Sequence, residues 1–330
     1  MPILEDSIRP FWVQGLNDIS GHVVKGLGGW IRDEDFQIYS GVQADSFALA
    51  VADSRSLLSA FAADVNRLST ASLESAISVA RIEGLPRSTA WTIIKSYYSA
   101  FFAAHSILRI LGLSVSRFDG NQVNSVNKIA NVFGAILQPA TKGHYRCTFD
   151  SSKKELSCTK INLGSGGVHE AFWSVFNARL RQLSTDVLIL KIGTIANNQV
   201  ASAKLSELSE NLCGDPATGG SWLSFMRNEV NYSHRWGTWY PYEGYQATHG
   251  DRLYDGHFIW VEDPLRIDLA SYAGRDLLRF QQTCNFLVAL CRALVIDMSR
   301  RCSTGNSFHT YGPLAILNLV RQRPRMQPVK

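Results

Sequence analysis

The chain has 330 residues, of which 45% are hydrophobic and 18% are charged, a composition typical of a globular protein with a sizeable core. Its formal net charge of +5 allows a polyanionic partner, but the chain lacks the dense basic stripe of dedicated duplex-binding proteins. Six cysteines without a Cys-x-x-Cys pair exclude a disulfide scaffold and give no indication of structural zinc or thioredoxin chemistry.

Residues 1–86 are interpreted as an N-terminal extension with an irregular start followed by two helices. The "GLGG" segment near its start is interpreted as a turn, because the setting and the lysine of a phosphate-binding loop are missing. From Asp45 onward apolar residues recur at helical spacing, which predicts a first helix up to about Leu68. A second helix is predicted over residues 72–84, with Gly84 as its stop signal.

The strongest predicted helix covers residues 88–112. Ser88 can cap its start, and Gly112 can end it. One histidine, His105, lies on its apolar face, where a core histidine with one satisfied nitrogen is the default interpretation over a catalytic role. The members of this face recur every three or four residues and are Ile94, Tyr97, Tyr98, Phe101, Phe102, His105, Leu108 and Leu111.

After a shorter helix around residues 124–137, a β-hairpin is predicted at about residues 143–162. Two β-prone arms flank the polar tip "SSKK", so the hairpin interrupts an otherwise helical chain. A four-residue tip sets the register, which places Asp150 opposite Glu155 and Cys147 opposite Cys158. We expect these two cysteines to face each other as free thiols.

The rest of the chain is predicted to be helical up to a basic tail. The hairpin and the aromatic loop belong to a helical domain of residues 87–302, and residues 303–330 form the tail. The predicted elements are helices at about 169–183, 198–211 and 269–301, a break at 213–220, an aromatic loop at about 235–262 and a strand near 257–263.

The stretch "SFMRNEVNYSHRWG", residues 224–237, carries the best candidate site. On an ideal α-helix Arg227 and His234 lie within roughly 20° of each other, two turns apart, with Asn231 between them. Arginine offers planar, permanently charged donors that suit phosphate oxygens, and histidine can give or take a proton near neutral pH. RNA cleavage by attack of the 2′-hydroxyl needs little more than such groups, namely a base, a cation and an acid, and it needs no metal.

This stretch resembles the signature of HEPN-domain proteins, in which an arginine, a polar residue and a later histidine recur. Here the pattern reads Arg227, Asn228, five residues and His234. The helix "SYYSAFFAAHSILRILG", with its aromatic pair before an alanine-rich apolar run, also resembles the opening helix of many HEPN domains. The resemblance covers residues 88–302 and leaves the first 85 or so unexplained.

The resemblance implies a mainly α fold, a HEPN-like helical bundle with an inserted β-hairpin and an N-terminal helical extension. It implies a homodimer in which two motifs form a composite active site. Many such proteins are ribonucleases of toxin–antitoxin, abortive-infection or antiviral systems, while others have lost catalysis and bind a nucleotide or a protein. Carried over to this chain, Arg227 would stabilise the scissile phosphate, His234 would be the acid or base, and Asn228 would orient substrate or histidine.

Nine aromatic residues lie between Tyr232 and Trp260, a local excess. They could stack unpaired RNA bases, or they could build the small core of a long loop. The substrate-binding candidates are Asn231, Tyr232, Arg235, Trp236 and Trp239.

The expected partners are RNA, a second copy of the chain and an antitoxin or regulatory protein; no metal and no cofactor are expected. The N-terminus lacks the cationic and apolar regions of a signal peptide, and Arg292 interrupts the most apolar late stretch. A cytoplasmic protein that does not enter the membrane is therefore expected.

Overall fold

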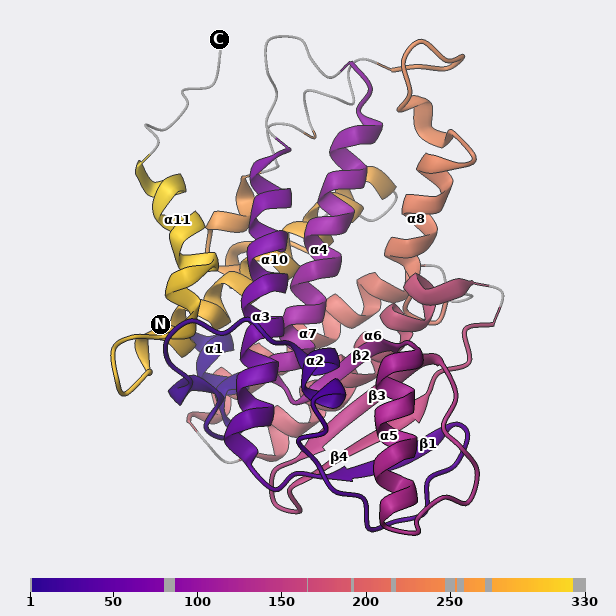
Figure 1. Ribbon diagram of the computed structural model, residues 1–330. Coiled ribbons are helices and arrows are strands. Elements are labelled where there is room, and N and C mark those ends of the chain that lie inside the picture. Colours follow the sequence, from indigo (N-terminus) through magenta and orange to yellow (C-terminus); the bar gives the residue numbers. More distant parts are fainter. Residues whose placement is uncertain are drawn as a thin grey trace.

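The computed structural model describes residues 2–79, 87–164, 166–190, 193–214, 218–246, 253, 258–270 and 275–322. It is mainly helical, as predicted, with one small antiparallel sheet at one end of the helices (Figure 1). The helices are α1 (Ile3–Ile8), α2 (Leu27–Arg32), α3 (Ser54–Ile77), α4 (Ala90–Ile110), α5 (Gly120–Val132), α6 (Gly167–Ile189), α7 (Ile195–Cys213), α8 (Trp222–Asn231), α10 (Asp276–Arg300) and α11 (Pro313–Gln322). The strands are β1 (Ser46–Ala50), β2 (Leu113–Phe118), β3 (Gly143–Asp150) and β4 (Glu155–Lys160).

Helix α4 is central to the packing, because it contacts α3, α10, α8 and strand β2. In Figure 1, α3 and α4 run upright beside each other, with α10 behind them and α8 at one side. Gly112 adopts a positive φ of 75° directly after α4, which ends the helix as predicted. Ser88 does not cap its start; its hydroxyl instead accepts a hydrogen bond from the backbone N–H of Tyr240 at 3.0 Å.

The predicted hairpin is confirmed, including its register. β3 and β4 pair antiparallel with Cys147 opposite Cys158 and Asp150 opposite Glu155. The two cysteines are free and buried, and their Sγ atoms lie 3.3 Å apart. The hairpin is not an isolated insertion, however. It forms the middle of a four-stranded sheet of order β1-β4-β3-β2, whose outer strands come from residues 46–50 and 113–118.

Strand β1 replaces the start of the first predicted helix. The run from Phe47 to Val51 is short and apolar, so its period alone cannot separate a helix from a strand. Because this run pairs with β4, it forms a strand, and Phe47 and Leu49 are buried on one of its faces. After β1, Asp53 caps α3 by accepting a hydrogen bond from Arg55 N at 2.9 Å. One continuous helix, α3, then takes the place of the two helices that were predicted.

Two other segments also differ from expectation. The predicted strand near residues 257–263 is a single 3₁₀ turn over Ile259–Val261. Arg292 of α10 donates to the carbonyl oxygens of Trp260 and Glu262 at 3.2 and 2.7 Å, so a side chain satisfies groups that a sheet neighbour would otherwise bind.

At the other end of the chain, part of the expected tail folds as α11, which packs on α3. Gly84, residues 247–252 and 254–257 of the aromatic loop, and residues 323–330 of the tail lie outside the described residues.

The core is continuous from the N-terminal helix to the C-terminal one. Leu4 of α1, Phe61 of α3, Tyr97 of α4, Tyr145 of the sheet and Leu317 of α11 belong to the same cluster of buried residues. The first 79 residues are thus part of the body that holds the predicted helical domain. Over the described ranges, no helix is both long enough and apolar enough to cross a membrane.

The cysteines allow a test of this packing. Cys213 is half-buried, while the other five cysteines are buried. Burial also raises the pKa of the Cys158 thiol well above its usual value, which keeps it in the unreactive protonated form. Iodoacetamide at pH 8 is therefore expected to label Cys213 first in the native protein, as measured by peptide mass spectrometry. Labelling of Cys147 or Cys158 as fast as Cys213 would contradict the structure, and urea-unfolded protein provides the reference.

Candidate functional site

Helix α8 holds Arg227 inside the protein. Trp222, Leu223, Met226 and Val230 of this helix are buried, and so are the polar residues Ser224 and Arg227. Phe225 is the exposed apolar residue of α8, at 39%. The polar stripe that begins at Ser224 and Arg227 therefore points inward, toward α4 and α6, which both pack on α8.

The Arg227 guanidinium lies over an aromatic ring and lacks a carboxylate partner. Its central carbon is 5.3 Å from the centroid of Tyr97, and only 9% of the residue is exposed. Among the described residues, none forms an ion pair with Arg227, and its Nε has no hydrogen-bond partner. A buried cation that no carboxylate neutralises is costly, and a bound anion would lower that cost.

His169 joins this arginine through Tyr97. The Tyr97 hydroxyl and His169 Nδ1 are 2.8 Å apart, and the Trp173 indole N–H donates to the same hydroxyl oxygen at 3.0 Å. Three helices meet here, because Tyr97 belongs to α4, His169 and Trp173 to α6, and Arg227 to α8. Within the described part of the chain, no residue hydrogen-bonds His169 Nε2, which leaves this nitrogen for a ligand.

Burial keeps the histidine and the tyrosine neutral at physiological pH. Burial, followed by the neighbouring Arg227 cation, lowers the pKa of His169 to about 4. Burial likewise raises the pKa of Tyr97 to about 12, although hydrogen bonding from Trp173 and the charge of Arg227 act in the opposite direction. The cluster of Arg227, Tyr97 and His169 (the α4–α6–α8 cluster) thus holds one fixed cation, one neutral imidazole and one neutral phenol.

The structure separates His234 from Arg227, contrary to the expectation of one helical face. Helix α8 ends at Asn231, and His234 lies beyond it in the left-handed region with φ 51° and ψ 32°. The chain therefore leaves the helical path before the second turn is complete. His234 is exposed, and its ring packs near Tyr242 and Trp239, at centroid distances of 5.0 and 6.2 Å.

The other predicted polar residues lie around the end of α8. Asn228 and Asn231 are half-buried on the helix, and Tyr232, directly after it, is 74% exposed. Arg235 is exposed and pairs with Glu229 through Nε and Oε2 at 2.6 Å. These side chains surround the helix end but leave Arg227 on its buried side.

The two predicted tryptophans hold the loop to the protein. The Trp239 indole N–H donates to the carbonyl oxygen of Val230 at 2.7 Å, and its ring meets Trp91 edge-to-face at 5.5 Å. Trp236 is half-buried against the core with φ 60°. Both alternatives for the aromatic segment thus apply to different members. Trp236 and Trp239 build a small core, whereas Tyr232 and Tyr242 present exposed rings.

Sequence reasoning did not assign a role to His169. It has no neighbour at metal-ligand spacing, and no sequence distance indicates that it meets Tyr97, 72 positions earlier. The sequence feature that points to His169 is the aromatic pair Tyr97–Tyr98. The rings of both tyrosines contact the His169 imidazole.

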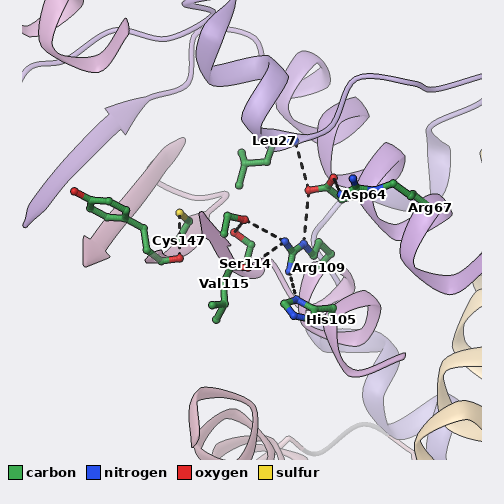
Figure 2. A network of polar contacts seen from close by, with 10 residues as sticks. Leu27, Asp64, Arg67, His105, Arg109, Ser114, Val115 and Cys147 are labelled. Atoms are coloured by element: carbon green, nitrogen blue, oxygen red, sulfur yellow. Dashed lines mark hydrogen bonds and ion pairs between the residues drawn. The ribbon is translucent and has the colours of Figure 1, made fainter. Parts of the chain in front are cut away.

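A second polar network lies farther along α4, around Arg109 (Figure 2). This arginine is 4% exposed, and its Nη atoms contact His105 Nδ1 at 3.0 Å, Ser116 Oγ at 3.1 Å and the Val115 carbonyl oxygen at 3.4 Å. Asp64 lies opposite, with Oδ2 3.7 Å from Arg109 Nε. His105 is therefore a buried partner of an arginine rather than only an apolar-face histidine, and burial lowers its pKa well below the usual value.

Stability is expected to fall as the pH decreases from about 6.5 toward 4. Burial lowers the pKa of His169 to about 4 and that of His309 to about 3, from 6.5 in the unfolded chain. Below pH 6.5 the unfolded imidazoles bind protons while the folded ones stay neutral, so acid favours unfolding. Urea unfolding between pH 7.5 and 4.5 measures the slope. His169→Gln is expected to make this slope shallower, and an unchanged slope would contradict a half-buried His169 that stays neutral.

In the portion of the chain that the structure describes, no group of three or more His, Cys, Asp or Glu side chains is arranged to hold a metal ion. Comparison of the whole chain with protein-family models, with curated proteins and with solved structures finds no match.

Proposed function

We propose that this protein is a metal-independent endoribonuclease of the HEPN type, with its site at the α4–α6–α8 cluster. The observation that carries the proposal is the buried guanidinium of Arg227, which no described carboxylate pairs and which lies beside a neutral imidazole. An RNA phosphate would supply the missing anion. The resemblance of residues 227–234 to the HEPN signature supports the same assignment.

The chemistry needs a base, a cation and an acid. The base takes the 2′-hydroxyl proton while the 2′ oxygen attacks phosphorus, and the P–O bond to the 5′ oxygen breaks. The acid then returns a proton to that leaving oxygen. Arg227 would stabilise the charge on the phosphate oxygens during this displacement. His169, with Nε2 available, and His234, exposed beside the cluster's helix, are the two groups able to move protons. The products would be a 2′,3′-cyclic phosphate and a 5′-hydroxyl end.

A second copy of the chain would complete the site. Exposed aromatic rings lie on α4 and just after α8, namely Trp91 at 48% and Tyr232 at 74% exposure. A two-fold axis beside the end of α8 would place a second Arg227 and a second His234 across from the first, since an isologous interface repeats each residue. Cleavage is then expected to decrease when the protein is diluted below its dimer dissociation constant.

The experiment that tests the proposal is incubation of the purified protein with single-stranded and structured RNA in excess EDTA. Cleavage is expected to persist, and its products are expected to carry 5′-hydroxyl ends, which polynucleotide kinase labels without prior phosphatase treatment. Loss of cleavage in EDTA with recovery on adding Mg²⁺, or products with 5′-phosphates, would reject this mechanism. As a cytoplasmic nuclease it would act as a toxin or antiviral effector, held inactive by an antitoxin or regulatory protein.

Tyr232 and Trp239 are expected to respond differently to substitution. Tyr232→Ala removes an exposed ring and is expected to weaken binding of single-stranded RNA by about 1–3 kcal/mol without changing thermal stability. Trp239→Ala removes the hydrogen bond to Val230 and the contact with Trp91, so it is expected to lower the melting temperature. Filter binding and thermal denaturation measure the two effects. Weaker RNA binding by Trp239→Ala at unchanged stability would reverse these assignments.

A second candidate function is a catalytically silent HEPN-like module that binds a nucleotide or a partner protein. The observation that favours it is the 9% exposure of Arg227, whose guanidinium already rests on Tyr97. Binding of RNA without cleavage, under any metal condition and at high protein concentration, would favour this module over the nuclease.

A further inference from the structure

A cleft of about 1130 Å³ lies at the end of α4 that faces the sheet. Its walls come from the segment that leads into α2, from α3, from α4 and from β2 with the turn that follows it. The volume slightly exceeds the roughly 300–1,000 Å³ that small-molecule sites usually occupy. The cleft is separate from the α4–α6–α8 cluster, because Arg227, His169 and Tyr97 do not line it.

The floor of the cleft is the buried Arg109. Contacts with His105, Ser116 and the Val115 carbonyl fix its guanidinium, and Figure 2 shows its ion pair with Asp64. Its Nε has no hydrogen-bond partner. The nearest carboxylate oxygen, Asp64 Oδ2, is 3.7 Å from Nε, beyond hydrogen-bond range. The floor therefore presents a fixed, buried guanidinium that is ion-paired with Asp64 but keeps one donor without a hydrogen-bond acceptor, and a guanidinium can bind a further anionic oxygen.

Cations outnumber acids along the walls. Five cationic side chains and three acidic ones line the cleft, an excess of two positive charges. Arg117 and Arg67 are exposed at the rim, where Arg67 pairs with Asp64 at 3.2 Å. The cationic residues are Lys25, Arg32, Arg67, Arg109 and Arg117, and the acidic ones are Asp64, Glu74 and Asp119.

The acids and one aromatic ring narrow the class of ligand. A nucleic-acid backbone presents a phosphate charge at every nucleotide, and this repeated charge would meet Glu74 and Asp119 unfavourably. A ligand that carries both a phosphate and hydroxyl or amino groups satisfies both kinds of side chain, because carboxylates accept hydrogen bonds from such groups. Tyr311, 53% exposed at one wall, offers a ring on which a base can stack.

Small residues keep the α2 segment against the floor. A Cβ on Gly26 would lie 2.2 Å from Asp64 Oδ1, so only glycine allows the backbone to approach this carboxylate. The N–H of Leu27 then donates to Asp64 Oδ2 at 3.4 Å. The "GLGG" segment is therefore part of the cleft wall, and Asp64 holds it beside Arg109.

We propose that this cleft binds a phosphorylated nucleoside, with the phosphate at Arg109 and the rim arginines and the base against Tyr311. The inference is independent of the nuclease proposal, since none of its residues belongs to the α4–α6–α8 cluster.

The test is isothermal titration calorimetry of the full chain with AMP, GMP, CMP, UMP and the corresponding triphosphates. At least one nucleotide is expected to bind. Arg67→Gln and Arg117→Gln are each expected to weaken it about tenfold, equivalent to about 1.4 kcal/mol. Tyr311→Leu is expected to weaken the nucleotide but not pyrophosphate. Arg266→Gln, an exposed arginine that does not line the cleft, is the matched control and is expected to bind normally.

Three outcomes would overturn the proposal. The first is no binding of any nucleotide at millimolar concentration by protein with a normal melting temperature. The second is equal affinity for pyrophosphate and nucleotide, which would leave the base unused. The third is nucleotide binding that Arg67→Gln and Arg117→Gln leave unchanged. The rim variants avoid the buried Arg109, so the test does not depend on a substitution that disturbs folding.

Discussion

Arg227→Met is expected to lower the rate of RNA cleavage in EDTA by about 10²–10³-fold, the usual loss when one group that stabilises transition-state charge is removed. Methionine keeps an apolar side chain on the Tyr97 ring but removes the cation. Because the guanidinium has no described carboxylate partner, its loss leaves no buried acid unpaired. Single-turnover rates with a fluorescent RNA, measured beside thermal stability, separate a catalytic effect from unfolding.

Histidine variants assign the proton transfers in the same assay. His169→Gln and His234→Gln are each expected to lower the rate by about 10²–10⁴-fold if both groups act as acid or base. Arg55→Gln, at the exposed start of α3, is the matched arginine control and is expected to cleave normally. Full activity of His169→Gln would leave His234 as the only histidine in the reaction. Full activity of Arg227→Met would reject the proposed site.

Asp64→Ala is expected to destabilise the protein by about 3–5 kcal/mol, the cost of breaking a buried ion pair by removing one partner. Asp64 is buried, lies 3.7 Å from Arg109 and 3.2 Å from Arg67, and accepts a hydrogen bond from Leu27. Its loss leaves the Arg109 charge buried beside neutral groups alone. Urea unfolding at pH 7.5 measures the change in the free energy of unfolding.

Two comparisons make this prediction specific. The pair Glu34–Lys128 lies at the surface, so Glu34→Ala is expected to cost less than about 1 kcal/mol. The double variant Asp64→Leu/Arg109→Met removes both charges and is expected to be more stable than Asp64→Ala alone. A loss below about 1 kcal/mol for Asp64→Ala would show that solvent in the cleft already screens Arg109.

The helices that pack by an apolar face could be predicted from the sequence, and the sheet only in part. The period of three and four residues indicates α4 and α6, and the four-residue tip sets the register of β3 and β4. Strands β1 and β2 have five and six residues, too few for the period to separate strand from helix. Their identity depends on partners that lie at least 105 and 25 positions away, since at the nearest Ala50 pairs with Glu155 and Phe118 pairs with Gly143.

The candidate site shows the same division between local and distant information. Arg227 could be found because its neighbourhood in the sequence resembles a motif. The position of His234 could not, because the end of α8 depends on Trp239, whose N–H binds the Val230 carbonyl from a later turn. His169 and the Asp64–Arg109 pair are tertiary contacts between helices, and no spacing along one helix encodes them.

The sheet has a consequence for how the chain can be divided. Its strands come from residues 46–50, 113–118 and 143–160, so β1 is joined to the hairpin only through pairing with β4. A shortened chain of residues 87–302 would leave β4 as an unpaired edge and uncover the side of α4 that α3 covers. Bare strand edges and apolar helix faces promote aggregation. The N-terminal segment, residues 1–86, is thus expected to be required for residues 87–302 to stay folded and in solution. Deletions from the N-terminus are therefore expected to cause loss of folding rather than loss of a separate module.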